Sequence, residues 1–198
     1  PLVVGASPFA DDVGMAVRLQ EAGAAAIVMR SLFEEQIDLE QRAMAHHIDI
    51  AAESSPEATS FFPEFEDYQL TPDRYLQQIT KLKSALTIPV IASLNGQQNG
   101  GWIDYARRFE AAGADAIELN LYRLSTDPEL SSEEVEEEMI GTVRDVVTSV
   151  RIPVAVKLSP FHAALPHYAR LLDQTGAGGL VLFNRFYQAD FDIAELEV

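Results

Sequence analysis

The chain contains no cysteine, and this absence excludes several kinds of chemistry from its 198 residues. It cannot form a disulfide bond, offers no thiolate nucleophile and supplies no cysteine ligand to an iron–sulfur cluster. Two nucleotide-binding motifs are also missing, the GxGxxG turn of dinucleotide sites and the GxxxxGK loop of phosphate sites. A cofactor with its own reactivity is then the simplest source of chemistry.

Basic residues are few, with 14 Lys and Arg against 31 Asp and Glu, which gives a formal net charge of -17. A protein this acidic repels phosphate backbones, so nucleic-acid binding is not expected. No apolar run approaches the roughly 20 residues that a membrane-spanning helix needs. We therefore expect a cytoplasmic protein that acts on a small molecule without contacting a membrane.

One pattern occurs three times along the chain: the tail of a helix, a Gly-Ala turn, a short apolar strand and then a polar residue. It is found in residues 21–31 (EAGAAAIVMRS), around 113–120 (GADAIELN) and in 174–184 (QTGAGGLVLFN). Residues 2–6 and the Pro-led segments 88–94 and 152–158 bring the predicted strands to six. Strands that alternate with helices indicate a parallel sheet covered by helices. Polar residues at the strand C-termini favour a (β/α)8 TIM barrel over an open doubly wound sheet.

A complete barrel of this kind typically needs about 250 residues and eight strands. We therefore interpret residues 1–198 as one barrel domain that is incomplete and belongs to a longer protein. Residues 33–70 form a long insertion after the second strand, with an acidic helical part and a loop rich in Pro, Ser and aromatic residues. Insertions of this length are typical of lids and interfaces, with disorder as the alternative.

Metal binding is not predicted. His162 and His167 are five residues apart and would not share a helical face, and the adjacent His46 and His47 would also diverge. The acidic run EEVEEE follows Ser131, which forms a capping box with Glu134, so these carboxylates are explained by the start of a helix.

Amide and basic side chains gather at the predicted strand ends. They are all four asparagines of the chain and four of its basic residues: Asn95, Asn99, Asn120, Asn184, Arg30, Arg123, Lys157 and Arg185. Amides can donate to and accept from the edge of a heterocycle, and a lysine can stabilise negative charge on an oxygen or a cofactor ring. This pattern predicts a binding site there. The alternative is that loops after strands are simply polar.

Several of these segments resemble the dihydroorotate dehydrogenase superfamily, in particular its divergent dihydroorotate dehydrogenase-like branch. The resemblance is carried by PLVVGASP at the start, AGADAIELNL around the fourth strand, PVAVKLSP at the fifth and GLVLFNR at the sixth. It implies an FMN-binding barrel, a flavoprotein of pyrimidine metabolism that moves a hydride between a substrate carbon–carbon bond and the flavin.

The resemblance also implies roles for individual residues. Lys157 would lie against the pyrimidine edge of the flavin, Asn120 would contact flavin and substrate, and Asn184 would line the same pocket. Beyond the resemblance, we expect Asn95 and Asn184 to face the substrate. Further FMN contacts would come from the ends of the first two strands, at Ala6, Ser7, Arg30 and Ser31. The family's phosphate-binding loops follow strands seven and eight, which this sequence does not contain.

The substrate side departs from the family. Arg123 occupies the position of the catalytic base, and an arginine cannot accept a proton at neutral pH. Tyr122, Ser125 or Tyr187 could supply an acid, and Ser125 could contact the substrate, for which a dihydropyrimidine is one candidate. The residues that we predict to take part in catalysis are Lys157, Asn120, Tyr122 and Arg123.

Three functions stay open at this point. The first is an FMN-dependent oxidoreductase of the CH–CH class with its usual base replaced. The second is a non-catalytic flavin-binding or interaction subunit of a larger assembly. The third is a phosphate-dependent barrel isomerase or lyase without flavin, and a homodimer is compatible with each.

Overall fold

The structure is a computed structural model that describes residues 1–33, 72–95, 101–121 and 127–184. Predictions for the rest of the insertion at 33–70 lie outside these ranges. Within the described residues, no helix is both long and apolar enough to cross a membrane.

Six parallel strands form one sheet in the sequential order β1-β2-β3-β4-β5-β6. Each of the six predicted strands is present, and helices connect them as the alternating pattern predicts. The elements are β1 (Leu2–Val4), η1 (Pro8–Ala10), α1 (Val13–Glu21), β2 (Ala24–Phe33), α3 (Pro72–Ala85), β3 (Val90–Asn95), α4 (Gly101–Ala111), β4 (Ala116–Leu121), α5 (Ser132–Ser149), β5 (Val154–Leu158), α6 (Leu165–Asp173) and β6 (Gly179–Leu182).

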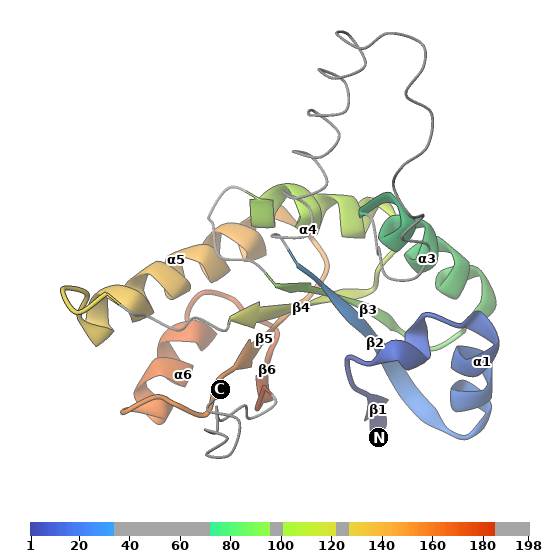
Figure 1. Ribbon diagram of the computed structural model, residues 1–198, viewed down its shortest axis with the longest axis horizontal. Helices are drawn as coiled ribbons and strands as arrows, with labels where there is room; N and C mark the ends of the chain where they lie inside the picture. The colour runs from blue at the N-terminus through green and yellow to red at the C-terminus, as the bar shows by residue number, and fades with distance from the viewer. Residues whose placement is uncertain (34–71, 96–100, 122–126, 185–198) are drawn as a thin grey trace, which may run out of the picture.

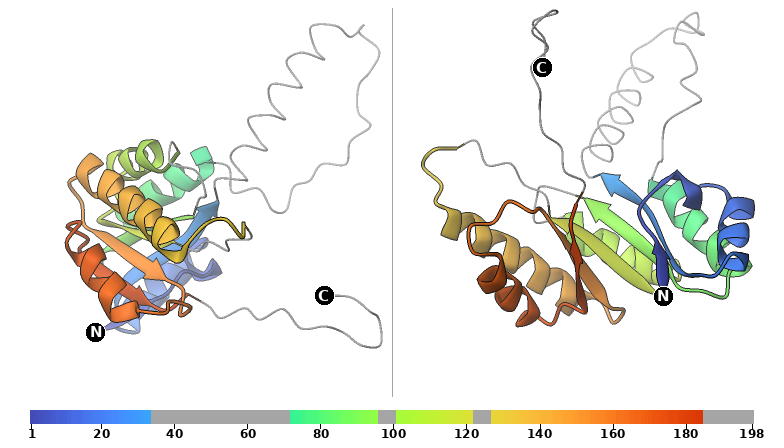
Figure 2. Two further views of the ribbon diagram at one scale, coloured as in Figure 1. Left: turned by 90° about the vertical axis from the view of Figure 1, so that its left-hand side faces the viewer. Right: turned by 90° about the horizontal axis from the view of Figure 1, so that it is seen from below.

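The sheet is an arc and not a closed barrel. Figure 1 shows the strands curving from β1 to β6 with the helices on the outer side of the arc, and Figure 2 shows the same arrangement from two further directions. In the described part of the chain, β1 pairs only with β2 and β6 only with β5. The prediction of a (β/α)8 barrel is therefore wrong, because closing such a sheet takes eight strands paired on both edges. The observed fold is a six-stranded parallel half-barrel, which is consistent with a partial TIM barrel.

Alternation along the strands separates an apolar outer face from a more polar inner face. On β4, Ile117, Leu119 and Leu121 belong to the hydrophobic core that the helices cover. Successive side chains of a strand point to opposite faces, so Glu118 and Asn120 lie on the inner, concave face. The same rule puts Ser93 and Asn95 of β3 and Lys157 of β5 on that face, since Val90, Ala92, Leu94, Val154, Val156 and Leu158 belong to the core.

The repeated Gly-Ala turn has a clear conformational cause. Gly23, Gly113 and Gly176 each end a helix with positive φ, at 97°, 98° and 89°. This left-handed conformation is common just after a helix and favours glycine, which lacks a Cβ. The three turns deliver the chain into β2, β4 and β6.

Two helices begin with capping carboxylates, and the predicted capping box of Ser131 and Glu134 is confirmed. Asp12 caps α1 by accepting a hydrogen bond from the Met15 amide at 2.7 Å. Ser131 and Glu134 form the capping box of α5, and the hydrogen bonds that Ser131 donates lower the pKa of the Glu134 carboxyl. These carboxylates are thus explained by helix capping.

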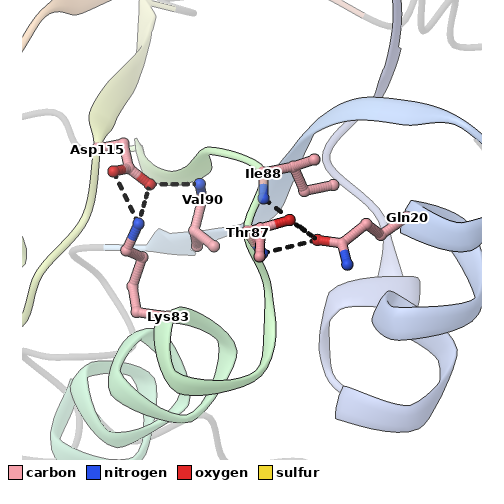
Figure 3. A network of polar contacts seen from close by, with 6 residues as sticks. All are labelled: Gln20, Lys83, Thr87, Ile88, Val90 and Asp115. Carbon is pink, nitrogen blue, oxygen red and sulfur yellow. Dashed lines mark hydrogen bonds and ion pairs between the residues drawn. The ribbon is translucent and has the colours of Figure 1, made fainter.

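A polar network connects the segments that enter β3 and β4, at the N-terminal ends of these strands (Figure 3). Lys83 donates to both oxygens of Asp115, at 2.8 and 2.7 Å, and the amide of Val90 donates to the same carboxylate at 2.7 Å. Gln20 Oε1 accepts from the amides of Thr87 and Ile88, at 2.7 and 3.2 Å. The network fixes the entry into β3 from α1, from α3 and from the turn before β4.

Candidate functional site

A layer of polar side chains crosses the concave face at the C-terminal ends of three neighbouring strands. Asn95 of β3 is in register with Asn120 of β4, and Asn120 is in register with Lys157 of β5. In-register residues of adjacent strands are close neighbours on the same face. The fold therefore brings these three predicted site residues together from distant parts of the sequence.

Asn184, which follows β6, joins this layer. Its side-chain Nδ2 donates to Asn120 Oδ1 at 3.0 Å, and its backbone amide donates to the carbonyl of Leu158 at 2.7 Å. The two amides orient each other across β5. Asn120 is 6% exposed, so its orientation is set mainly by protein partners.

One level below, hydroxyl and charged groups form a continuous chain across β2 to β5. Ser31 Oγ lies 2.8 Å from Ser93 Oγ, and Ser93 Oγ lies 3.3 Å from Glu118 Oε1, to which it donates. Lys157 Nζ donates to the same carboxylate oxygen at 3.2 Å. Glu118 is thus the acceptor on which both sides of the chain converge.

Glu118 is the site residue that the sequence analysis missed. Its side chain is 5% exposed and that of its partner Lys157 is 15% exposed, so the ion pair is largely withdrawn from solvent. A signal for it was available, because a glutamate inside the apolar run AIEL is unusual and stands two residues from Asn120, hence on the same face of the strand.

Tyr75 of α3 fixes Ser93 from the outer side of the sheet. The β2–β3 register shifts between Val28 and Ser31, which interrupts the ladder beside Ser93. The Tyr75 hydroxyl accepts from the Ser93 amide at 2.8 Å and donates to the Ser93 carbonyl at 3.2 Å. Burial raises the pKa of Tyr75, so the group stays a neutral phenol. The hydroxyl therefore satisfies two backbone groups that the interrupted ladder leaves open.

Arg30, predicted to bring positive charge to the strand ends, lies in an ion pair with Asp11. Its Nη2 is 2.6 Å from Asp11 Oδ2. Burial raises the pKa of the Asp11 carboxyl, while the neighbouring Arg30 acts in the opposite direction. Among the described residues, both predicted strand-end cations, Arg30 and Lys157, are paired with carboxylates. The expected concentration of positive charge is thus largely compensated.

The end of β1 supplies Ala6 and Ser7, both partly buried. The buried polar atoms Ser7 Oγ and Arg30 Nε have no hydrogen-bond partner within the part of the chain that the structure covers. Buried polar atoms are normally paired, so these two are candidates for a ligand contact.

The remaining predicted site residues, Tyr122, Arg123, Ser125 and Tyr187, lie outside the described residues, as do Asn99 and Arg185. Their roles stay predictions. Within the described ranges, no group of three or more His, Asp or Glu side chains is arranged to hold a metal ion.

Comparison with solved structures shows the fold. A phosphonopyruvate hydrolase matches with a TM-score of 0.54 and 16% identity, over 90% of this chain and 56% of its own. The dihydrodipicolinate synthase (DHDPS) of Cyanidioschyzon merolae matches with a TM-score of 0.54 and 13% identity, over 88% of this chain and 52% of its own. These neighbours are TIM-barrel enzymes, in agreement with a partial barrel.

Comparison with protein families and curated sequences gives a second kind of result. No family model matches the chain. A protein of Aeropyrum pernix provisionally named dihydroorotate dehydrogenase A (fumarate) is 32% identical over 116 residues, 54% of this chain and 35% of that protein. The dihydroorotate dehydrogenase A (fumarate) of Lacticaseibacillus paracasei is 29% identical over 54% of this chain and 38% of its own.

The catalytic subunit of the Bacillus pumilus dihydroorotate dehydrogenase B (NAD(+)) is 28% identical over 53% of this chain and 34% of its own. The matches thus cover little more than a third of these relatives. Over about half of its length, the chain is a divergent relative of the dihydroorotate dehydrogenases.

Proposed function

We propose that the chain supplies part of the active site of an FMN-dependent oxidoreductase of the dihydroorotate dehydrogenase kind, which acts on a carbon–carbon bond of a small substrate. One observation carries the proposal. Asn120, Lys157 and Asn184, from three separate segments of a chain related to dihydroorotate dehydrogenases, meet at the C-terminal ends of β4 to β6. That edge of a parallel barrel sheet is where such folds bind ligands.

The residues present fit the ring of FMN. The pyrimidine edge of a flavin offers carbonyl acceptors and an N–H donor, and an ammonium group with amides can satisfy both kinds. The orphaned Ser7 Oγ and Arg30 Nε lie at positions that resemble FMN contacts of the family; the serine hydroxyl can donate or accept a further hydrogen bond, and the arginine Nε can donate one. The fit concerns the ring alone, because the resemblance assigns the phosphate group to loops after strands seven and eight, and the sheet of the described residues consists of β1 to β6.

When bound, FMN would supply the acceptor or donor of the hydride. Lys157 would then oppose negative charge at the pyrimidine edge of the ring, held in place by Glu118. Asn120, oriented by Asn184, would bind the same ligand from the neighbouring strand. Asn95 would extend this layer toward the substrate, for which we propose a dihydropyrimidine.

Proton transfer is the step for which the chain departs from its relatives. We propose that Tyr122, Ser125 or Tyr187 supplies the acid, and that Arg123, at the usual position of the base, binds an anionic group instead. The same substitution supports a second candidate, a non-catalytic flavin-binding subunit. Rapid-mixing reduction of the bound flavin by dihydroorotate and dihydrouracil separates the two, since a non-catalytic subunit shows no reduction.

The test of the flavin itself is a visible absorption spectrum of the purified full-length protein. We expect a flavin spectrum and, after heat release, a chromophore that co-elutes with FMN. A colourless protein that takes up no added FMN would overturn the proposal.

A further inference from the structure

Each cation that the structure describes at the strand ends is paired with a carboxylate, so the pair as a whole offers a ligand little net charge. Lys157 is paired with Glu118 at 3.2 Å, and Arg30 is paired with Asp11 at 2.6 Å. At such distances the field of each cation is largely cancelled by its partner. A carboxylate or phosphate placed against Lys157 would also be repelled by the nearby Glu118 carboxylate.

The Lys157–Glu118 pair is also the more enclosed of the two. Its side chains are 15% and 5% exposed, whereas those of Arg30 and Asp11 are 32% and 35% exposed. Water screens an enclosed pair weakly, so removing either of its charges would change the electrostatic field at a bound ligand strongly. Ser93 Oγ adds a second contact by donating to Glu118, which holds the carboxylate on the concave face.

The surroundings of the pair favour a flat ring. The next level of the concave face carries the amides of Asn95, Asn120 and Asn184, which offer donors and acceptors without charge. Exposed aromatic side chains lie near the strand ends: Phe33 is the last residue of β2, and Phe161 and Phe183 follow β5 and β6, with exposures of 38%, 63% and 43%. Aromatic rings pack well against the faces of planar ligands.

We infer that Glu118 is a positioning residue that holds the Lys157 ammonium on the concave face and keeps this part of the site electrically neutral. The site therefore binds the uncharged imide edge of a planar ring in preference to a carboxylate or phosphate. The inference deepens the proposed function by naming the charge state of the bound group. The inference rests on the proposed function in one respect, which is that the planar ring is a flavin.

The test compares two small probes, uracil and barbiturate, by calorimetry on flavin-free full-length protein near neutral pH. Both are pyrimidine rings with alternating N–H and C=O groups, but uracil is neutral and barbiturate is an anion. We expect the wild-type protein to bind uracil more tightly. Glu118→Gln unmasks the Lys157 charge and should shift the affinity ratio at least tenfold toward barbiturate.

Two further variants separate an effect of charge on the affinity ratio from an effect of misfolding. Lys157→Met should shift the ratio in the opposite direction, because it leaves the Glu118 carboxylate uncompensated. The double variant with both substitutions contains neither charge and should return to the wild-type ratio. Asp115→Asn is the matched control, since it disrupts the Lys83–Asp115 ion pair at the opposite ends of the strands and should leave the ratio unchanged.

An unchanged ratio in Glu118→Gln, a wild-type preference for barbiturate, or no binding of either probe would each overturn the inference. The flavin spectrum is a separate result. A protein that never takes up flavin, yet shows the expected ratios, would contradict the proposed function and support the charge selectivity.

Discussion

Asn184 Nδ2 donates to Asn120 Oδ1 at 3.0 Å, although 64 residues separate the two amides in the sequence. Each amide thereby fixes which end of the other faces outward, and the contact bridges the end of β4 and the segment after β6. Convergence of this kind, on side chains from separate strands, is how parallel α/β folds build ligand sites.

The first prediction is that Asn184→Ala weakens the proposed flavin site more than it weakens the fold. Loss of one hydrogen bond should cost about 1 kcal/mol of unfolding free energy. The affinity for flavin should fall several-fold, because Asn120 loses the partner that orients it. Denaturant unfolding and flavin titration measure the two effects. A stable variant with unchanged flavin affinity would show that the Asn120–Asn184 contact is only structural.

Lys157→Ala is expected to reduce turnover far more than it reduces bound flavin. The ammonium would act on charge that develops at the ring during reaction, whereas the ring also has amide contacts that remain. The variant should also be destabilised by about 3–5 kcal/mol, since it leaves the Glu118 carboxylate buried without its counter-ion.

The measurements are the flavin absorbance per protein and the rate of substrate-dependent reduction, with thermal unfolding alongside. Lys83→Ala is the control, because its partner Asp115 is more exposed and lies away from the strand C-termini. Unchanged turnover in Lys157→Ala would refute the role assigned to this lysine.

The sequence predicted the repeating parts of the structure and missed what depends on pairing between strands. The strands, the Gly113 turn and the Ser131 cap follow from local patterns, because each is determined by neighbouring residues. The (β/α)8 barrel was inferred from strand–helix alternation and polar strand ends, which an open arc of six parallel strands among the described residues shows equally well. The cancellation of the Lys157 charge required knowing that Glu118, on the neighbouring strand, lies within reach.

Tyr75 and Tyr168 offer a matched pair of buried hydroxyls. Both residues are 0% exposed, but the Tyr75 hydroxyl bonds to the backbone of Ser93, whereas the Tyr168 hydroxyl has no partner within the described residues. Tyr75→Phe should therefore cost about 1–3 kcal/mol by leaving two backbone groups unsatisfied. Tyr168→Phe should be neutral or stabilising, because it removes a polar group that is buried without a partner. Equal destabilisation of the two variants in urea unfolding would contradict this assignment.

The same two tyrosines predict a loss of stability in alkali. Burial is the main cause that raises the pKa of each above the ordinary value of about 10. In the unfolded chain these phenols would ionise first, so the unfolded state binds fewer protons than the folded state above that pH. Their contribution to stability is fully present below pH ~10 and decreases as the pH rises further. Thermal unfolding between neutral and alkaline pH should show this decrease, and Tyr168→Phe should make it shallower. A pH profile that the substitution leaves unchanged would contradict it.

The last prediction concerns two glycines that have room for a Cβ but differ in backbone conformation. Gly113 turns the chain into β4 with φ at 98°, and a Cβ there would meet nothing closer than Lys83 Cγ at 3.8 Å. Space is therefore not limiting, and Gly113→Ala should cost about 1–2 kcal/mol from the left-handed backbone alone. Gly141 lies within α5, where an added Cβ has nothing within 4 Å, so Gly141→Ala should stabilise the protein by about 0.5–1 kcal/mol. Denaturant unfolding of both variants should thus give changes of opposite sign, and a stabilising Gly113→Ala would show that the turn does not require its positive φ.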